Sequence, residues 1–316
     1  MAEGKDLATA VPLDAWMASL PAPMRERSVC ELALPGAHNS GAHGVLTVPQ
    51  EFLARHIGEQ LASWSFLPKL VAPFAGFSAV CQDLPVAGLL RAGVRALDFR
   101  LGLCNGEVYV CHTVVCTVTW RQVLAEVREF LEANAGEVVV VMATRDWEHK
   151  SFGTPEHWER VQRDMEEVLG ELLCRSPRAL HLSIEELCAS GGRVIPLLQV
   201  PRTAQQTLGI PINGSSLKKS WLPDTKTVEA MAHIIALWRD GGLAKPERGL
   251  LKFLEIALPG IPRQHAAQAN AAFRNFLAQG PLHIGAMMDF PDEETVRALL
   301  AHNWACPPEA QDVDSG

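Results

Sequence analysis

The sequence predicts an α/β fold in which parallel strands, joined by helical crossovers, form an irregular barrel. Apolar runs typical of strands alternate with helical patterns along most of the 316 residues. Barrels of this kind commonly reach such a length as a single domain. One pair of strands is separated only by a short turn, so the sheet is not purely parallel and any barrel is irregular.

Seven runs have the composition of strands, with room for an eighth. They lie near residues 30–34, 94–101, 108–113, 137–144, 194–200, 250–257 and 282–289. The second and third are joined by Cys104-Asn105-Gly106-Glu107, and Asn-Gly between two apolar runs predicts a β-hairpin.

Helices are expected in the connections. Thr119 is the predicted N-cap of a helix over Trp120–Ala133, and Gly136 follows its end. Further helices are expected over residues 155–174, 228–238, 265–278 and 293–302. We therefore expect one barrel domain over residues 25–304, an N-terminal segment over 1–24 and a polar tail over 305–316.

Composition limits the classes of function. Hydrophobic residues make up 48% of the chain, which is enough for a substantial core. The charge is 28 minus 36, or −8, without a basic block, and this argues against a nucleic-acid partner. No apolar run reaches the length of a membrane span and no signal peptide is evident, so we expect a cytoplasmic protein. The eight cysteines contain no C-x-x-C pair, which favours buried free thiols over a metal site.

A long insert, residues 50–82, separates the first two strands. It contains Trp64, Phe66, Phe74 and Phe77, and segments of this length are often functional. Packing under the barrel edge is the default explanation for these aromatic residues. The alternative is an exposed ridge that makes peripheral contact with a membrane.

Polar residues follow the first three strands, whose ends meet at the active-site face of a barrel. His38 and Asn39 come after the first strand, where Pro-Gly is expected to break it. Asp98 and Arg100 lie two residues apart on the second strand and share one face, about 7 Å apart. Alone, they would form a structural ion pair or a phosphate site. His112 ends the third strand, which the hairpin aligns beside them.

Two histidines and an arginine at adjacent strand ends fit the cleavage of a phosphodiester. Internal attack needs a base for a hydroxyl proton, an acid for the leaving oxygen and positive charge at the phosphoryl oxygens. His38, His112 and Arg100 could supply these roles without a metal.

Five segments resemble, in order and spacing, the X-domain phospholipases C specific for phosphatidylinositol (PI-PLC). They are LPGAHNSGAH, AGVRALDFRL, EVYVCHTVV, EVVVVMATRDWEH and HIGAMMDFP. The sequence is most similar to the single-domain PI-PLC X domain-containing proteins and to bacterial PI-PLC, with a weak match over residues 180–249. The resemblance implies an irregular TIM-type barrel that acts on a phosphatidylinositol-type lipid at a membrane surface. The implied products are diacylglycerol and an inositol phosphate that is cyclic at first.

The resemblance also implies a role for each site residue. His38 is the implied general base on the inositol 2-hydroxyl, and His112 the general acid on the diacylglycerol oxygen. Arg100 would clamp the phosphate, while Asp98 and Asn39 occupy positions that orient these groups.

Three residues complete the implied site. Asp289 falls where the family has a carboxylate that supports the base. Arg145 matches a basic position that contacts the headgroup in bacterial relatives, and Trp221 could stack on the inositol ring.

The sequence departs from the larger signalling members of the family at their calcium site. Those members carry a Glu-x-Asp pair where this chain has Asp98-Phe99-Arg100. A guanidinium cannot share that position with calcium, so we expect a calcium-independent reaction with no metal or cofactor. Two alternatives stay open: a non-catalytic module that binds an inositol lipid or a protein, and a metal-dependent phosphodiesterase on the same barrel.

Overall fold

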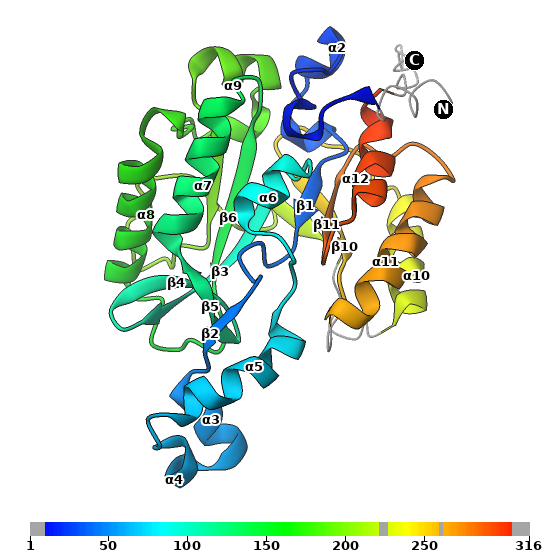
Figure 1. Cartoon of the computed structure of the whole chain (residues 1–316). Helices are drawn as coiled ribbons and strands as arrows, with labels where there is room; N and C mark the ends of the chain where they lie inside the picture. The colour runs from blue at the N-terminus through cyan, green and yellow to red at the C-terminus, as the bar shows by residue number, and fades with distance from the viewer. Residues whose placement is uncertain (1–9, 221–226, 259–261, 305–316) are drawn as a thin grey trace.

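The computed structural model describes residues 10–220, 227–258 and 262–304, and strands run through its centre (Figure 1). Parallel neighbours follow the order β8-β7-β6-β3-β1-β11-β10-β9. These strands are β1 (Pro35–Ala37), β3 (Ala96–Cys104), β6 (Val139–Arg145), β7 (Val194–Leu198), β8 (Ile210–Pro211), β9 (Leu217–Lys219), β10 (Leu251–Ile256) and β11 (Gly285–Met288). Within the described chain β8 and β9 do not pair, so the predicted barrel is open along one seam.

Three antiparallel strands extend the sheet beyond β3. They are β2 (Val45–Thr47), β4 (Glu107–His112) and β5 (Val114–Thr119). At the turn between β3 and β4, Asn105 and Gly106 have φ angles of 51° and 77°, which are typical of a tight hairpin turn. The predicted hairpin is therefore confirmed, and it brings the end of β4 beside β3.

Helices connect most of the parallel strands. They are α6 (Val86–Arg91), α7 (Trp120–Ala133), α8 (Pro155–Leu169), α9 (Ile184–Ser190), α10 (Val228–Asp240), α11 (Pro262–Leu277) and α12 (Glu293–Leu300). The Thr119 side chain accepts a hydrogen bond from the backbone N–H of Gln122, as expected for the predicted N-cap of α7. Residues 199–209 and 212–216, which flank β8, contain no helix, and the open seam lies next to them.

The first strand begins later than the sequence predicts. Val29–Glu31 form a 3-10 turn, and β1 itself contains the Pro-Gly pair that was expected to end the strand. Pro35 is the first residue of β1, a position where a strand tolerates proline. A Cβ atom at Gly36 would lie 2.6 Å from the sulfur of Met287 and 3.1 Å from the carbonyl oxygen of Ala286, so glycine suits the close approach of β1 and β11.

The described part of the expected N-terminal segment packs against the barrel. It includes a 3-10 turn (Leu13–Ala15) and α2 (Ala22–Arg25). Trp16 and Met17 are fully buried, and the backbone N–H of Met17 donates to Glu137. Glu137 also forms a completely buried ion pair of 2.8 Å with Arg95. These contacts bind the segment to the residues that immediately precede β3 and β6.

The insert forms three helices, α3 (Gln50–Ile57), α4 (Glu59–Ala62) and α5 (Leu67–Ala79). In Figure 1 they project below β2 and β5, at the end of the molecule where the barrel strands finish. Trp64, Phe66, Phe74 and Phe77 are 50%, 57%, 69% and 68% exposed. The default explanation, burial under the barrel edge, is therefore wrong. None of the described helices is both long and apolar enough to cross a bilayer.

Candidate active site

A cavity of about 800 Å³ opens between the strand ends and the insert. The polar part of its lining includes His38, Arg100, His112 and Asp289. The apolar part comes largely from the insert and includes Phe52, Leu53, Val71 and Phe74. The cavity thus joins titratable groups at the end of the barrel to an apolar wall.

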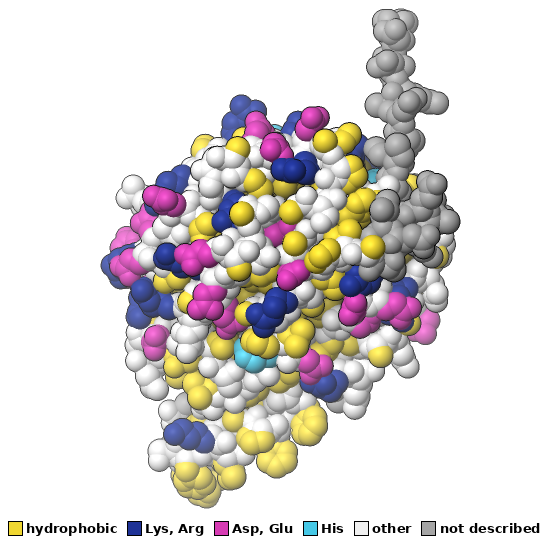
Figure 2. All heavy atoms as spheres, turned by 45° about the horizontal axis from the view of Figure 1, so that its top comes forward, with side chains coloured by type: hydrophobic (Ala, Val, Ile, Leu, Met, Phe, Trp, Pro, Cys, Tyr) yellow, Lys and Arg dark blue, Asp and Glu magenta, His cyan; other side chains and the backbone are white. Residues whose placement is uncertain are grey.

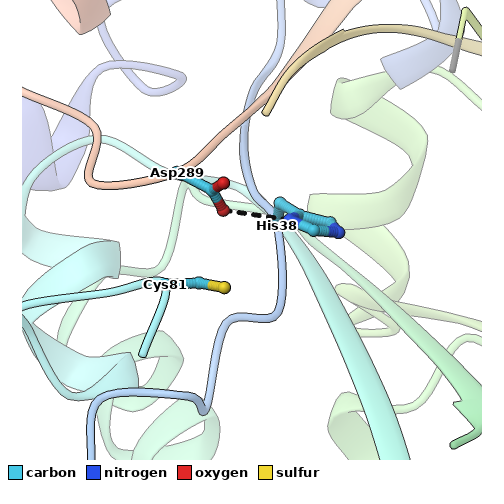
Figure 3. Close-up of side chains that lie close together, drawn as sticks. All are labelled: His38, Cys81 and Asp289. Atoms are coloured by element: carbon cyan, nitrogen blue, oxygen red, sulfur yellow. Dashed lines mark hydrogen bonds and ion pairs between the residues drawn. The ribbon is translucent and has the colours of Figure 1, made fainter. Parts of the chain in front are cut away.

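His38 and Asp289 form the central pair of the cavity (Figure 3). They follow β1 and β11, which pair in register at Ala37 and Met288. His38 Nδ1 lies 2.9 Å from an oxygen of the buried Asp289 carboxylate. Burial disfavours the imidazolium, but the charge of Asp289 outweighs it, and the pKa of His38 is raised. With Nδ1 donating to the carboxylate, Nε2 is the nitrogen that can accept a proton.

His112, at the end of β4, lies opposite this pair. The His38 and His112 ring centroids are 6.3 Å apart. Burial, together with the positive charge of Arg100, lowers the pKa of His112 to about 4. His112 is therefore neutral at pH 7 while no anion occupies the cavity.

Arg100 is half-buried and lines the same cavity. Its guanidinium forms no hydrogen bond or ion pair with any residue that the structure describes. Most buried or half-buried cations in proteins are paired, and an unpaired guanidinium beside a cavity is suited to a phosphate or carboxylate ligand.

Asp98, two residues before Arg100, is held by a lysine from another part of the chain. Lys219 Nζ lies 3.0 Å from Asp98 and 3.2 Å from Glu255, both of which are buried. Burial would raise the pKa of Asp98, but the charge of Lys219 outweighs it and the pKa is lowered. Lys219 and Glu255 are absent from the sequence prediction. Glu255 could have been found, because an acid in an apolar strand needs a buried partner.

Cys81, near the end of the insert and just after α5, is a further residue that the sequence analysis missed. Its sulfur lies 3.4 Å from His112 Nδ1. The amide nitrogen of Asn39 lies 3.5 Å from the same sulfur and 3.2 Å from His38 Nε2. Burial raises the pKa of the Cys81 thiol well above its ordinary value, so the thiol is protonated and inert as a nucleophile.

Backbone strain is concentrated at this site. Three of the four non-glycine residues with positive φ in the described chain directly follow the two histidines and Asp289. They are Asn39, Thr113 and Phe290, with φ angles of 46°, 66° and 44°. Asparagine tolerates this region, but a β-branched threonine does not, and each such conformation costs of the order of 1–3 kcal/mol. Each of these three backbone positions thus directly follows a polar residue that lines the cavity.

Arg145 does not join the other predicted site residues. In the parallel register of β3 and β6, Arg100 pairs with Thr144, while Arg145 pairs with Leu101. Paired residues share a face, so Arg145 lies on the outer face with the buried Leu101, and it does not line the cavity. The expected headgroup contact by Arg145 is thus not supported by its position. Trp221 lies outside the described residues.

Comparison with known proteins identifies relatives by sequence. No family model matches the chain. Human PI-PLC X domain-containing protein 2 is 25% identical over 218 residues, covering 66% of this chain and 67% of that protein. The mouse protein of the same name is also 25% identical and is covered over 60% of its length. The variant-surface-glycoprotein phospholipase C of Trypanosoma brucei brucei is 30% identical over 139 residues, which span 40% of this chain and 37% of that protein.

Solved structures share the fold over nearly the whole chain. The phosphatidylinositol-specific phospholipase C of Listeria monocytogenes superimposes with a TM-score of 0.67 at 17% identity, covering 92% of this chain and 99% of that one. The Staphylococcus aureus enzyme gives a TM-score of 0.69 at 13% identity, with 94% and 99% covered. Most of the relatives found by sequence are PI-PLC X domain-containing proteins, and the fold of this chain is the irregular TIM-type barrel of bacterial PI-PLC. Both the predicted resemblance and the predicted fold class are confirmed.

Proposed function

We propose that this protein is a phospholipase C that cleaves the phosphodiester of a phosphatidylinositol-type lipid. The observation that carries the proposal is the convergence of His38, His112 and Arg100 on one cavity at the strand ends. A base, an acid and an unpaired cation are what internal attack on a phosphodiester requires. The names of the relatives and of the solved structures support the same reaction class.

The reaction runs in one displacement at phosphorus. Nε2 of His38 takes the proton of the inositol 2-hydroxyl, whose oxygen then bonds to phosphorus. The bond between phosphorus and the diacylglycerol oxygen breaks, and His112 gives that oxygen a proton. Asp289 stabilises the imidazolium that forms on His38, and Arg100 holds the phosphoryl oxygens. The products are diacylglycerol and a cyclic inositol phosphate.

Substrate binding prepares the acid for this step. The pKa of His112 is about 4 in the empty cavity because of burial and the nearby charge of Arg100. The phosphodiester brings one negative charge to Arg100 and offsets the field that disfavours a protonated His112. The pKa of His112 therefore rises when the lipid headgroup binds, and the ring can take up the proton that it later donates.

Two features support a reaction that does not need calcium. Arg100 places a permanent positive charge where the phosphate is expected to bind. The Asp98 carboxylate, which would otherwise be a calcium ligand, is already neutralised by Lys219 at 3.0 Å. Calcium would have to displace a buried ion pair to use it.

The insert is the proposed contact with the membrane. Its exposed apolar side chains are Ile57, Leu61, Trp64, Phe66, Leu70, Phe74 and Phe77. Figure 2 shows apolar side chains in yellow at the lower tip of the molecule, in the region of the projecting helices of Figure 1. Aromatic side chains in such a patch are suited to the interface of a bilayer. Because Phe74 also lines the cavity, the apolar surface continues to the mouth where the headgroup would enter.

The test is product analysis with the full chain and phosphatidylinositol vesicles in the presence of a strong chelator. Phosphorus NMR should detect a cyclic inositol phosphate before any open monoester, together with released diacylglycerol. His38→Ala, purified in the same way, controls for contaminating activity. Vesicle binding without products would overturn the enzymatic proposal and favour a non-catalytic lipid-binding module.

A further inference from the structure

The cavity contains a group of side chains that the proposed reaction uses only in part. A ring nitrogen of His38, Cys81 Sγ and a carboxylate oxygen of Asp289 all lie within 4.8 Å of one another. Figure 3 shows the three side chains converging from separate segments of the chain. No other group of His, Cys, Asp and Glu in the described residues meets the same spacing. Cys81 has no task in the proposed displacement at phosphorus, so its place in this group calls for another explanation.

The spacing of these atoms suits a tetrahedral metal ion. Zinc binds imidazole nitrogen and carboxylate oxygen at about 2.0–2.2 Å, so two such ligands lie roughly 3.3 Å apart. His38 Nδ1 and Asp289 Oδ1 are 2.9 Å apart and share a proton, which an ion could replace after a small widening. A thiolate at about 2.3 Å from the ion would lie roughly 3.6 Å from the other two ligands. A movement of the sulfur by roughly an ångström would bring it into this range, since all ligand atoms of the group lie within 4.8 Å of one another.

The donor set selects the kind of cation. Thiolate and imidazole are ligands for zinc and other borderline or soft ions, whereas calcium and magnesium prefer sets of oxygen atoms. The thiol of Cys81 gives up its proton when its sulfur binds the ion, as metal-bound cysteines do. The resulting thiolate and the Asp289 carboxylate together carry two negative charges, which balance a divalent cation. This balance offsets the repulsion from Arg100, which lines the same cavity.

We propose that Zn²⁺ binds to His38, Cys81 and Asp289 and switches the catalytic centre off. The ion occupies Nδ1 of the ring and separates it from the carboxylate that supports it, so the base no longer functions. The proposed binding of Zn²⁺ is argued from the geometry of the three ligands alone. The proposed inhibition also rests on the proposed function. The site is thus a regulatory one, in which a transition metal competes with catalysis.

Metal binding is tested on the full chain with Co²⁺, because the absorption spectrum of a bound cobalt ion depends on its ligands. A cobalt-thiolate bond gives a charge-transfer band in the near ultraviolet, and a tetrahedral site gives visible bands. We expect both bands in the wild type, and their loss when Zn²⁺ is added in equal amount. Cys81→Ser should abolish the charge-transfer band, and Asp289→Asn should weaken binding at least tenfold. Cys30→Ala removes another buried thiol, one that contacts the Leu180 carbonyl, and should change nothing.

Inhibition is tested on phosphatidylinositol vesicles at buffered free Zn²⁺, with each variant compared with its own rate without metal. Wild type and Cys30→Ala should lose more than nine-tenths of their rate at a zinc concentration that leaves Cys81→Ser largely active. Equal inhibition of Cys81→Ser and wild type, or no cobalt-thiolate band, would overturn the zinc site. A cobalt-thiolate band in a protein that never cleaves the lipid would instead overturn the proposed function and leave the metal site standing. Circular dichroism confirms folding of each variant, and if Cys81→Ser does not fold, Asp289→Asn serves in the cobalt-binding test, which does not depend on activity.

Discussion

The Nδ1 atom of His112 lies 2.9 Å from the carbonyl oxygen of Ala79, the last residue of α5. A carbonyl can only accept, so Nδ1 is the donor and Nε2 is the nitrogen left to exchange protons with a substrate. The insert therefore has two parts in the proposed function. Its exposed side chains would meet the lipid, and its last helical residue orients the ring proposed as the acid.

A substrate with a better leaving group should restore the rate of a His112 variant but not that of a His38 variant. We expect His38→Ala and His112→Ala each to lower kcat on phosphatidylinositol by about 10²–10⁴ fold, the usual contribution of general acid–base catalysis. A nitrophenyl ester of inositol phosphate needs no proton on its leaving oxygen. It should restore much of the rate of His112→Ala but none of that of His38→Ala. Equal recovery in both variants would contradict the assignment of base and acid.

The charge of Arg100 should be visible in the titration of His112. Proton NMR of the ring should give His112 a pKa of about 4 in the free protein, because it is buried and lies near the guanidinium. Arg100→Gln removes the positive charge but leaves His112 buried, so the pKa of His112 should rise and stay below 6.5. Saturation with inositol cyclic phosphate should shift the pKa of the wild type in the same direction. A His112 titration that is identical in wild type and Arg100→Gln would show that the two side chains are not coupled.

Much of the site follows from local sequence patterns because strand ends and a hairpin carry it. The two-residue spacing of Asp98 and Arg100 puts both on one face. The Asn-Gly turn pairs β4 with β3 as far as Val110 and Leu101, and His112 lies two residues beyond this pair, where it lines the same cavity as Arg100. The same alternation places Arg145 away from the cavity, since an offset of one residue turns a side chain to the opposite face. Its register partner is Leu101 rather than Arg100.

Other parts of the site depend on contacts between distant segments. Lys219 meets Asp98 across 121 positions, and its strand has only three residues. No periodicity in so short a strand indicates which barrel residue it will face. Likewise Cys81 reaches the cavity only because the insert returns to the barrel at that point. The exposure of Phe74 and Phe77 also depends on how the insert helices pack, which their apolar composition does not specify.

Lys219→Met should destabilise the protein more than the same substitution of a surface lysine would. It leaves Asp98 and Glu255 buried without a counter-charge, and breaking a buried pair in this way costs about 3–5 kcal/mol of unfolding free energy. The variant Lys219→Met with Asp98→Asn and Glu255→Gln carries no charge at these three positions and should recover much of this loss. Urea unfolding at pH 7 measures all three proteins. A loss below about 1 kcal/mol for Lys219→Met would mean that the ion pairs behave like exposed ones.

The same ion pair predicts a pH dependence of stability. The folded protein lowers the pKa of Asp98, so its ionised form stabilises the fold above the unfolded value of about 3.9. This contribution is lost as the pH falls through the lower, folded pKa. In Lys219→Met the unpaired carboxylates instead prefer to be protonated. The stability gap between Lys219→Met and wild type should therefore narrow on acidification from pH 7 to pH 4, and a constant gap would contradict the electrostatic explanation.

Calcium should leave the rate on phosphatidylinositol vesicles unchanged. We expect less than a twofold difference between assays in excess chelator and assays in millimolar calcium, because Arg100 supplies the positive charge. Arg100→Ala should lose activity by orders of magnitude, and added calcium should not restore it. A requirement for calcium in the wild type would instead make Asn39 and Asp98 candidate ligands, with Lys219 displaced from the carboxylate.

The proposed membrane contact predicts that binding and stability respond separately to changes in the insert. Phe77 is 68% exposed and does not line the cavity. Phe77→Ala should weaken binding to phosphatidylinositol vesicles roughly tenfold, equivalent to about 1.4 kcal/mol. Trp64→Ala should do the same, since half of its surface is exposed. Sedimentation with vesicles measures the binding, and the rate on a soluble inositol phosphodiester should stay within a factor of two.

The stability of the insert variants distinguishes a membrane contact from burial of these aromatic side chains in the core. Truncation of a buried large aromatic side chain costs about 3–5 kcal/mol, whereas truncation of an exposed one changes the unfolding free energy by less than about 0.5 kcal/mol. We therefore expect Trp64→Ala and Phe77→Ala to melt within about 2 °C of the wild type. Leu237→Ala is the matched control, because Leu237 is 54% exposed on α10, away from the insert. It should leave vesicle binding unchanged. If Leu237→Ala weakens binding as much as Phe77→Ala, the contact with lipid is not specific to the insert, because any exposed apolar side chain would then serve equally well.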